Sequence, residues 1–131
     1  MRLPNTVFNK DQLAGFSWST KVTFNKDGRC YASVMIENCG ESLFEGWVNS
    51  GKVRRGSVTV WLFNGQGQIL STHCSGNFAV ALGHHKVVPW HFNVPVINLE
   101  QTEKVAIIHS TDSASLEITV EEARNRAQLV Q

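Results

Sequence analysis

The sequence has no long hydrophobic run and a modest charged fraction of 18%. No segment approaches the roughly 20 apolar residues that a membrane-spanning helix needs, and the start holds no apolar stretch of signal-peptide length. The net charge of +1, with both signs mixed, implies no general attraction to nucleic acid or membranes. We therefore expect a cytoplasmic protein with no nucleic-acid or membrane partner, while an exported protein that has lost its leader would look the same.

Cysteine is scarce, and Cys30, Cys39 and Cys74 leave an odd number for disulfide pairing. Cys30 and Cys39 flank one expected strand, which separates them by roughly 30 Å if the chain is extended. A disulfide requires Cα atoms within ~7 Å of each other. We therefore expect reduced, buried thiols, as in a reducing compartment.

The patterns that usually accompany catalysis or metal binding are also missing. The sequence contains no Cys-x-x-Cys, no His-Glu-x-x-His and no glycine-rich phosphate loop. Cys74 and His73 are adjacent on an expected strand and so point to opposite faces, which argues against a nucleophile–base pair. We expect no cofactor, no metal and no catalytic residue, and this absence favours a protein that is not an enzyme.

What the sequence does contain is the period-two alternation of half-buried β-strands. Residues 16–24 alternate, a turn at Asp27-Gly28 follows, and residues 29–38 lead back, which predicts a β-hairpin. Residues 56–74 hold two apolar runs joined by Asn-Gly-Gln-Gly, which predicts a second hairpin. Further strands are expected at residues 42–49, 85–96, 103–110 and 114–120, and a short helix at 121–130.

The strand at residues 114–120 has an alternative. Apolar residues between 116 and 130 also recur at helical spacing, and Asp112 or Ser113 could cap such a helix. The β-branched residues of 117–120 favour a strand followed by a helix.

One expected strand is apolar on both faces. Val58, Val60 and Leu62 share one face, while Trp61 and Phe63 share the other. A central strand with one face in the core and the other face covered would have this pattern.

About eight short strands, without alternating helices, predict an antiparallel β-sandwich or barrel. The chain of 131 residues, 42% apolar, suits one domain over residues 1–131 with its own core. The fold class predicted here is all-β: an antiparallel β-sandwich of about seven or eight strands with a short C-terminal helix.

Residues 60–70 read VWLFNGQGQIL, in which Leu62, Phe63 and Asn64 precede a turn with Gly67. This stretch resembles the Leu-Tyr-Asp signature of FxLYD-type domains, which are small immunoglobulin-like β-sandwiches of bacteria. The resemblance extends over roughly residues 30–95, although Val60 replaces the family's first aromatic residue. It implies an immunoglobulin-like fold and a binding role, and it implies no catalytic residue because the family supplies none.

Three histidines, His84, His85 and His91, lie close together in the sequence. On a strand His85 and His91 share the outward face but lie roughly 20 Å apart, whereas zinc ligands must lie ~2.0–2.1 Å from a common point. His73 or His109 could approach from a neighbouring strand. The cluster alone predicts an ordinary strand rather than a metal site.

Four tryptophans are the one compositional excess. Trp18, Trp61 and Trp90 lie in alternating strands and are expected to pack inside, with Pro89 indicating that the last of these strands is an edge strand or carries a bulge. Trp47 precedes a polar, basic segment and is expected to be the most exposed. An exposed tryptophan can stack on a sugar or anchor a protein partner.

These observations favour a non-enzymatic module that binds a protein partner or a carbohydrate. It would use an aromatic patch near Trp47 or an open sheet edge, including self-association through that edge. The candidate ligand-binding residues are Trp47, Arg54, Arg55, His85 and His91.

Two alternatives remain at this point. The first is a small enzyme or small-ligand carrier with a cavity lined by Trp61, Phe63 and a histidine from a neighbouring strand. The second is a structural subunit of a larger assembly, which the size and fold permit.

Overall fold

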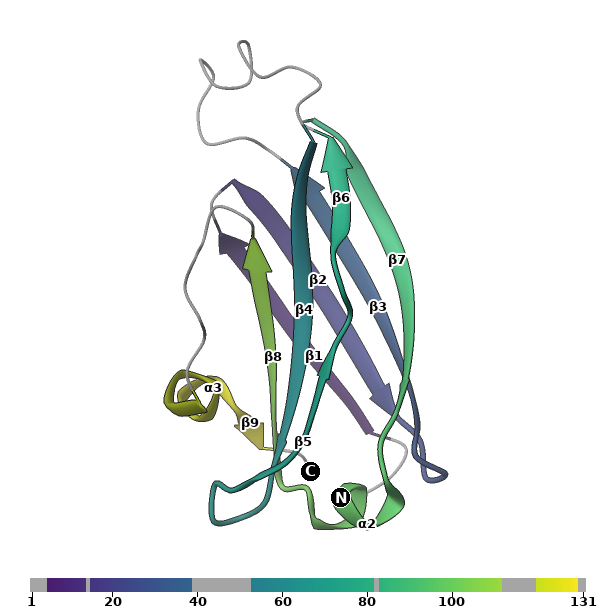
Figure 1. The fold of residues 1–131 in the computed structure, drawn as a ribbon, viewed down its shortest axis with the longest axis vertical. Coiled ribbons are helices and arrows are strands. Elements are labelled where there is room, and N and C mark those ends of the chain that lie inside the picture. Colours follow the sequence, from purple (N-terminus) through teal and green to yellow (C-terminus); the bar gives the residue numbers. More distant parts are fainter. Residues whose placement is uncertain (1–4, 14, 39–52, 82, 112–119, 130–131) are drawn as a thin grey trace.

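The computed structural model describes residues 5–13, 15–38, 53–81, 83–111 and 120–129. They form two antiparallel β-sheets packed face to face, which confirms the predicted β-sandwich with a short helix near the C-terminus (Figure 1). Sheet A has the strand order β1-β2-β3-β7, and sheet B has the order β5-β4-β8-β9, with β6 also paired to β4. The described residues thus contain nine strands.

The strands of sheet A are β1 (Asn5–Leu13), β2 (Phe16–Phe24), β3 (Arg29–Asn38) and β7 (His85–Asn93). The strands of sheet B are β4 (Val53–Phe63), β5 (Ile69–Cys74), β6 (Phe78–Ala81), β8 (Lys104–Thr111) and β9 (Gln128–Leu129). The helices are α2 (Val96–Gln101) and α3 (Val120–Arg126).

Both predicted hairpins are confirmed. The turn between β2 and β3 places Gly28 at φ 88°, and a Cβ there would lie 2.4 Å from the Val94 carbonyl oxygen, so only glycine fits. The turn between β4 and β5 is held by the Asn64 side chain, whose Oδ1 accepts hydrogen bonds from the backbone N–H groups of Gln66 and Gln68.

The main core lies between the sheets. Alternate side chains of β2, β3, β4 and β8 point inward and are almost fully buried, as the alternation in the sequence predicted for β2 and β4. Its largest members include Phe16, Trp18, Phe24, Ile36, Leu62 and Ile107. Each such side chain contributes about 1.5–3 kcal/mol through burial.

The outer face of β4 is covered, as its doubly apolar sequence predicted. Trp61 and Phe63 stack with ring centroids 6.3 Å apart. Phe63 packs with Ile108 of β8 and with Ala123 of α3 in a second, smaller buried cluster, against which Trp61 also packs. Helix α3 therefore covers part of the outer face of sheet B.

Several expectations need correction. The strand expected over residues 85–96 ends at Asn93, because Pro95 precedes α2, whose first residue is Val96. Val120, expected to end a strand, begins α3, where Glu121 and Glu122 occupy the first turn of a helix. Residues 42–49 and 114–119 lie outside the described residues.

The prediction of buried thiols holds for Cys30 and is wrong for Cys74, which is exposed. Cys74 ends β5 at the edge of sheet B, and its side chain lies on the outer face. Cys39 lies outside the described residues.

Candidate functional site

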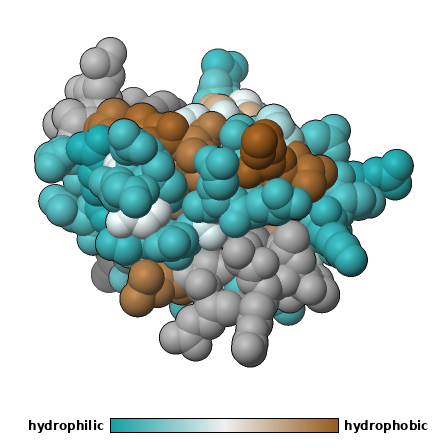
Figure 2. All heavy atoms as spheres, turned by 90° about the horizontal axis from the view of Figure 1, so that it is seen from below, coloured by the Kyte–Doolittle hydropathy of each residue, from teal (hydrophilic) through white to brown (hydrophobic). Residues whose placement is uncertain are grey.

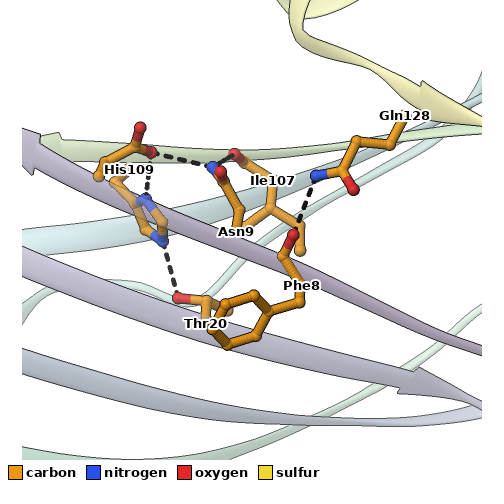
Figure 3. Close-up of polar contacts among 7 residues, drawn as sticks. Phe8, Asn9, Thr20, Ile107, His109 and Gln128 are labelled. Atoms are coloured by element: carbon orange, nitrogen blue, oxygen red, sulfur yellow. Dashed lines mark hydrogen bonds and ion pairs between the residues drawn. The ribbon is translucent and has the colours of Figure 1, made fainter.

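A chain of polar side chains links the two sheets inside the sandwich (Figure 3). Thr20 Oγ1 on β2 lies 2.7 Å from His109 Nε2 on β8, and His109 Nδ1 lies 2.6 Å from Asp11 Oδ2 on β1. Asn9 Nδ2 donates to the same carboxylate oxygen at 2.9 Å and to the Ile107 carbonyl at 2.8 Å. These bonds hold sheet A and sheet B together at the β1 side.

Burial determines the protonation state of His109 in this series of hydrogen bonds. It lowers the pKa of His109 below 6.5, partly offset by the Asp11 carboxylate, while Arg126 lowers it further. In the neutral imidazole, Nδ1–H donates to Asp11, so Nε2 accepts the hydroxyl proton of Thr20. The ring is also stacked on Trp18 at 4.8 Å, which fixes its orientation.

The order of hydroxyl, imidazole and carboxylate matches the order used in nucleophilic catalysis. Here, however, Thr20 is 0% exposed and His109 is 1% exposed, so a substrate cannot reach the hydroxyl. The arrangement therefore satisfies buried polar groups and ties the sheets together. One sign of this polar arrangement in the sequence was the polar residue Thr20 at a core-facing position of an alternating strand. The sequence could not identify the partner, because His109 lies 89 residues from Thr20 and 98 residues from Asp11.

The outer face of sheet A offers a more accessible surface. Exposed apolar side chains gather there from three of its strands: Phe8 on β1, Tyr31 and Met35 on β3, and Val87 on β7, with exposures of 46%, 40%, 49% and 59%. They are half of the large apolar side chains that are exposed among the described residues. Strand alternation places all four on the side away from the core.

A trough runs along the middle of this face. The short side chains of Ser17 and Ser19 on β2 form its floor, between the longer side chains of Phe8, Lys10 and Gln12 on one side and Met35 on the other. Its volume is about 570 Å³. Lys10 Nζ lies 5.5 Å from the centroid of the Phe8 ring, so an aromatic surface and a cation lie together on one wall.

The β3–β7 side of the same face carries side chains that pair across the two strands. Met35 pairs in register with Val87, and Tyr31 pairs with His91, whose rings lie 4.9 Å apart. His85, opposite Glu37, lies at the far end of the face. Both histidines point outward, as alternation predicted.

The remaining candidate residues are elsewhere. Arg54 and Arg55 belong to β4 of sheet B, where Arg55 is exposed, and Trp47 lies outside the described residues. The structure therefore places His85 and His91 on one face and does not bring the two arginines to it. Sequence reasoning missed Phe8, Tyr31 and Met35, because only strand register shows that they share a surface.

The ligand cavity expected beside Trp61 and Phe63 would need a histidine from a neighbouring strand. No histidine of the described strands lies beside these two rings. His73 and His109 both lie on the inner face of sheet B, opposite to these two rings. Beside Phe63 there is a surface depression of about 350 Å³ between the β4–β5 turn and α3. It is bridged by Arg124, whose Nε donates to the Gly67 carbonyl at 2.7 Å.

A further apolar area lies at the end of the sandwich that carries α2 (Figure 2). Val96 and Ile97 are exposed on that helix, and Ile69 is exposed at the start of β5. Figure 2 shows apolar surface at this end interrupted by hydrophilic side chains. The outer face of sheet A differs in having both an apolar strip and a trough.

Within the described ranges, no three His, Cys, Asp or Glu side chains gather as metal ligands would. None of the described helices is long and apolar enough to cross a membrane. No protein-family model matches the sequence, and no curated protein matches it.

Proposed function

We propose that the chain is a non-enzymatic binding module that engages its ligand on the outer face of sheet A. The observation that supports this most directly is the gathering of Phe8, Tyr31, Met35 and Val87 on one exposed face, where Phe8 and Met35 also line a trough floored by serine hydroxyls. Exposed apolar groups that cluster on a soluble domain usually mark an interaction site. The face is carried by four paired strands, so little ordering entropy is lost on binding.

A protein partner is the favoured ligand. The apolar strip that Met35 and Val87 form across β3 and β7 would be buried against apolar side chains of the partner, at about 25 cal/mol per Å². Lys10 beside the trough and Lys21 further along β2 carry positive charge on this face, and Glu37, opposite Ser17, carries negative charge at its end. The matching partner surface would therefore combine apolar side chains with an acidic group near the two lysines.

A carbohydrate is the second candidate, and the trough itself favours it. Aromatic rings give an apolar surface on which a sugar ring can stack, and serine hydroxyls supply hydrogen bonds beside it. Phe8, Ser17 and Ser19 provide this combination within one hollow.

The test uses single charged substitutions on the face. Met35→Glu and Val87→Glu place a carboxylate in the apolar strip at exposed positions, so the fold should persist while the affinity for a protein partner falls by about tenfold or more. Leu129→Glu, at an exposed apolar residue of β9, is the matched control. Binding to the immobilised chain that is unchanged by both face substitutions would contradict the proposal.

The two ligands are separated by a second pair of substitutions. Affinity electrophoresis in gels containing polysaccharides would show retardation of the wild-type chain if it binds glycans, and Phe8→Ser would abolish that retardation. Met35→Glu, on the other wall, would weaken it less. A chain that is retarded in no gel but loses partner binding on Met35→Glu is a protein-binding module.

A further inference from the structure

The outer edge of β5 has backbone groups without a strand partner among the described residues. Strand β5 is the last strand on its side of sheet B and is paired only with β4. Ser75 N–H donates to the Val58 carbonyl, and in an antiparallel pair every second residue directs its backbone N–H and C=O groups toward the partner strand. The backbone groups of His73 and Ser75 therefore face β4, whereas Thr72 and Cys74 direct their N–H and C=O groups away from the sheet.

The two edges of sheet A are protected. On β1, Lys10 carries a charge, and the Phe8 carbonyl accepts a hydrogen bond from Gln128 Nε2 at 3.0 Å (Figure 3). On β7, Pro89 lacks an N–H group and Lys86 carries a charge. Charged residues and proline are the usual devices that prevent an edge strand from pairing with another chain. Strand β5, with the sequence ILSTHC, has neither.

A second observation concerns the interior beside this edge. Core-facing side chains of β2, β3, β4 and β8 are almost fully buried, whereas Trp90 and Phe92 on β7 and Leu70 and His73 on β5 are only partly buried. The aromatic rings of His73, Phe92 and Trp90 form a continuous stack, with His73 4.9 Å from Phe92 and Phe92 4.6 Å from Trp90. Ser71 Oγ is hydrogen bonded to His73 Nε2 at the same place. The sandwich is thus less closed between β5 and β7 than between its central strands.

We infer that β5 pairs edge to edge and antiparallel with β5 of a second copy of this chain. The added strand would continue sheet B beyond β5 and would cover the partly exposed rings of Trp90 and Phe92. A two-fold axis through Thr72 places Thr72 opposite its counterpart and Leu70 opposite Cys74. The Leu70 carbonyl, which accepts from Asn98 Nδ2 at 3.1 Å, keeps a second lone pair for this pairing.

Charge favours a second copy as the partner. Residues 69–74 carry no Asp, Glu, Lys or Arg, and burial lowers the pKa of His73, so at neutral pH two such strands meet without like-charge repulsion. The chain as a whole has a formal charge of only +1 at pH 7, so two copies repel each other weakly. Val96 and Ile97 of α2, which is joined to β5 by the bond from Asn98, would flank the contact with further apolar surface. This inference uses sheet B and is independent of the proposed ligand face on sheet A.

The first test is size-exclusion chromatography with light scattering over a wide range of concentration. The wild-type chain is expected to be a dimer that dissociates on dilution. Thr72→Pro removes the outward N–H while leaving the bonds to β4 in place, so it should give a monomer. Thr72→Val keeps the N–H and should remain a dimer. A wild-type chain that is monomeric throughout, or a Thr72→Pro variant that is still dimeric, overturns the inference.

Hydrogen exchange tests the same contact without any substitution. The amides of Thr72 and Cys74 should exchange more slowly as the wild-type concentration rises, because dimer formation gives them acceptors. Exchange at these amides that does not depend on concentration would contradict the pairing. Met35→Glu should leave the dimer intact, so the failure of the ligand face and the failure of this edge contact are distinguishable.

Discussion

Gly56 and Trp18 show how strictly one residue can constrain another across this sandwich. A Cβ on Gly56 of β4 would lie 2.4 Å from Trp18 Cζ2 and 3.2 Å from the Ser110 carbonyl oxygen. The missing side chain on β4 is therefore what admits the indole ring of β2 to the core, where the ring also stacks on His109.

Gly56→Ala should accordingly destabilise the fold by about 1–3 kcal/mol, because the ring of Trp18 has to move in a closely packed interior. Urea unfolding followed by tryptophan fluorescence measures this change. Ser57→Ala, at the next residue, which points to the outer face of sheet B, should change the unfolding free energy little. Equal effects of the two substitutions would contradict the assignment of Gly56 to the packing of Trp18.

The polar chain through His109 gives a second prediction at this scale. His109→Phe keeps a ring of similar size but removes both nitrogen bonds, leaving Thr20 and Asp11 without their imidazole partner. Buried polar groups without partners cost about 1–3 kcal/mol each, so the loss of unfolding free energy should be about 2–4 kcal/mol. A variant as stable as the wild type would show that the hydrogen bonds of His109 contribute nothing to holding the two sheets together.

The same histidine predicts how stability depends on pH. Because burial lowers its pKa below 6.5 in the folded state, the unfolded state binds the proton first as the pH falls. Stability is therefore complete above the ordinary histidine pKa and is lost as the pH falls through 6.5 toward the folded-state pKa. Burial also lowers the pKa of His73, which adds a loss in the same direction.

Urea unfolding from neutral pH down to about 5 measures this loss. In the His109→Phe variant, the loss of stability on acidification should be smaller than in the wild type. The loss that remains is the one that His73 contributes. Ser57→Ala, which removes no titratable group, should leave the pH dependence unchanged. Stability that is constant or rises on acidification would contradict the assigned direction.

At the scale of elements, helix α3 acts as a cover for sheet B. Ala123 is buried against Phe63 and Ile108, and Arg124 ties the helix to the β4–β5 turn through its bond to the Gly67 carbonyl. A helix of this length is not stable in isolation, so its packing against the sheet is what maintains it.

Ala123→Asp tests this role. A carboxylate buried among apolar side chains without a partner should cost at least about 3 kcal/mol of unfolding free energy, with a shift in the emission of Trp61 as the helix detaches. Asn125→Asp introduces the same charge at an exposed position of the same helix and should have little effect. Equal stability of both variants would show that α3 does not cover the sheet.

Strand alternation was sufficient to predict the interior of β2 and β4, because the inward face of each is mostly apolar. It did not predict β1, whose interior-facing positions include Asn9 and Asp11. Polar residues are placed inward there because they bond to β8, and that pairing depends on tertiary contacts between residues 98 apart. Local pattern contains no information about such partners.

The candidate site was predictable to a similar degree. Alternation correctly directed His85 and His91 outward, but it could not show that Phe8, Tyr31 and Met35 share their surface. That grouping depends on the order β1-β2-β3-β7, in which β7 joins the first three strands after three intervening strands of the described chain, β4, β5 and β6. The resemblance to FxLYD-type domains stays a prediction.

On the scale of the whole molecule, the two sheets present different outer surfaces. The outer face of sheet B is partly covered by α3, whereas no described element covers the outer face of sheet A (Figure 1). The uncovered face carries the apolar strip and the trough, and the opposite sheet carries the unprotected edge at β5. One chain could therefore hold a ligand on sheet A and a second copy on sheet B at the same time.

The most direct test of the ligand face is site-specific photo-crosslinking in cells that naturally produce this protein. A photoreactive phenylalanine analogue would replace Val87, which is 59% exposed on the apolar strip, or Asn125, which is exposed on α3. A discrete adduct to a molecule other than a second copy is expected from position 87, and no adduct is expected from position 125. No adduct from position 87, or the same adduct from both positions, would contradict the assignment of the outer face of sheet A as the binding surface.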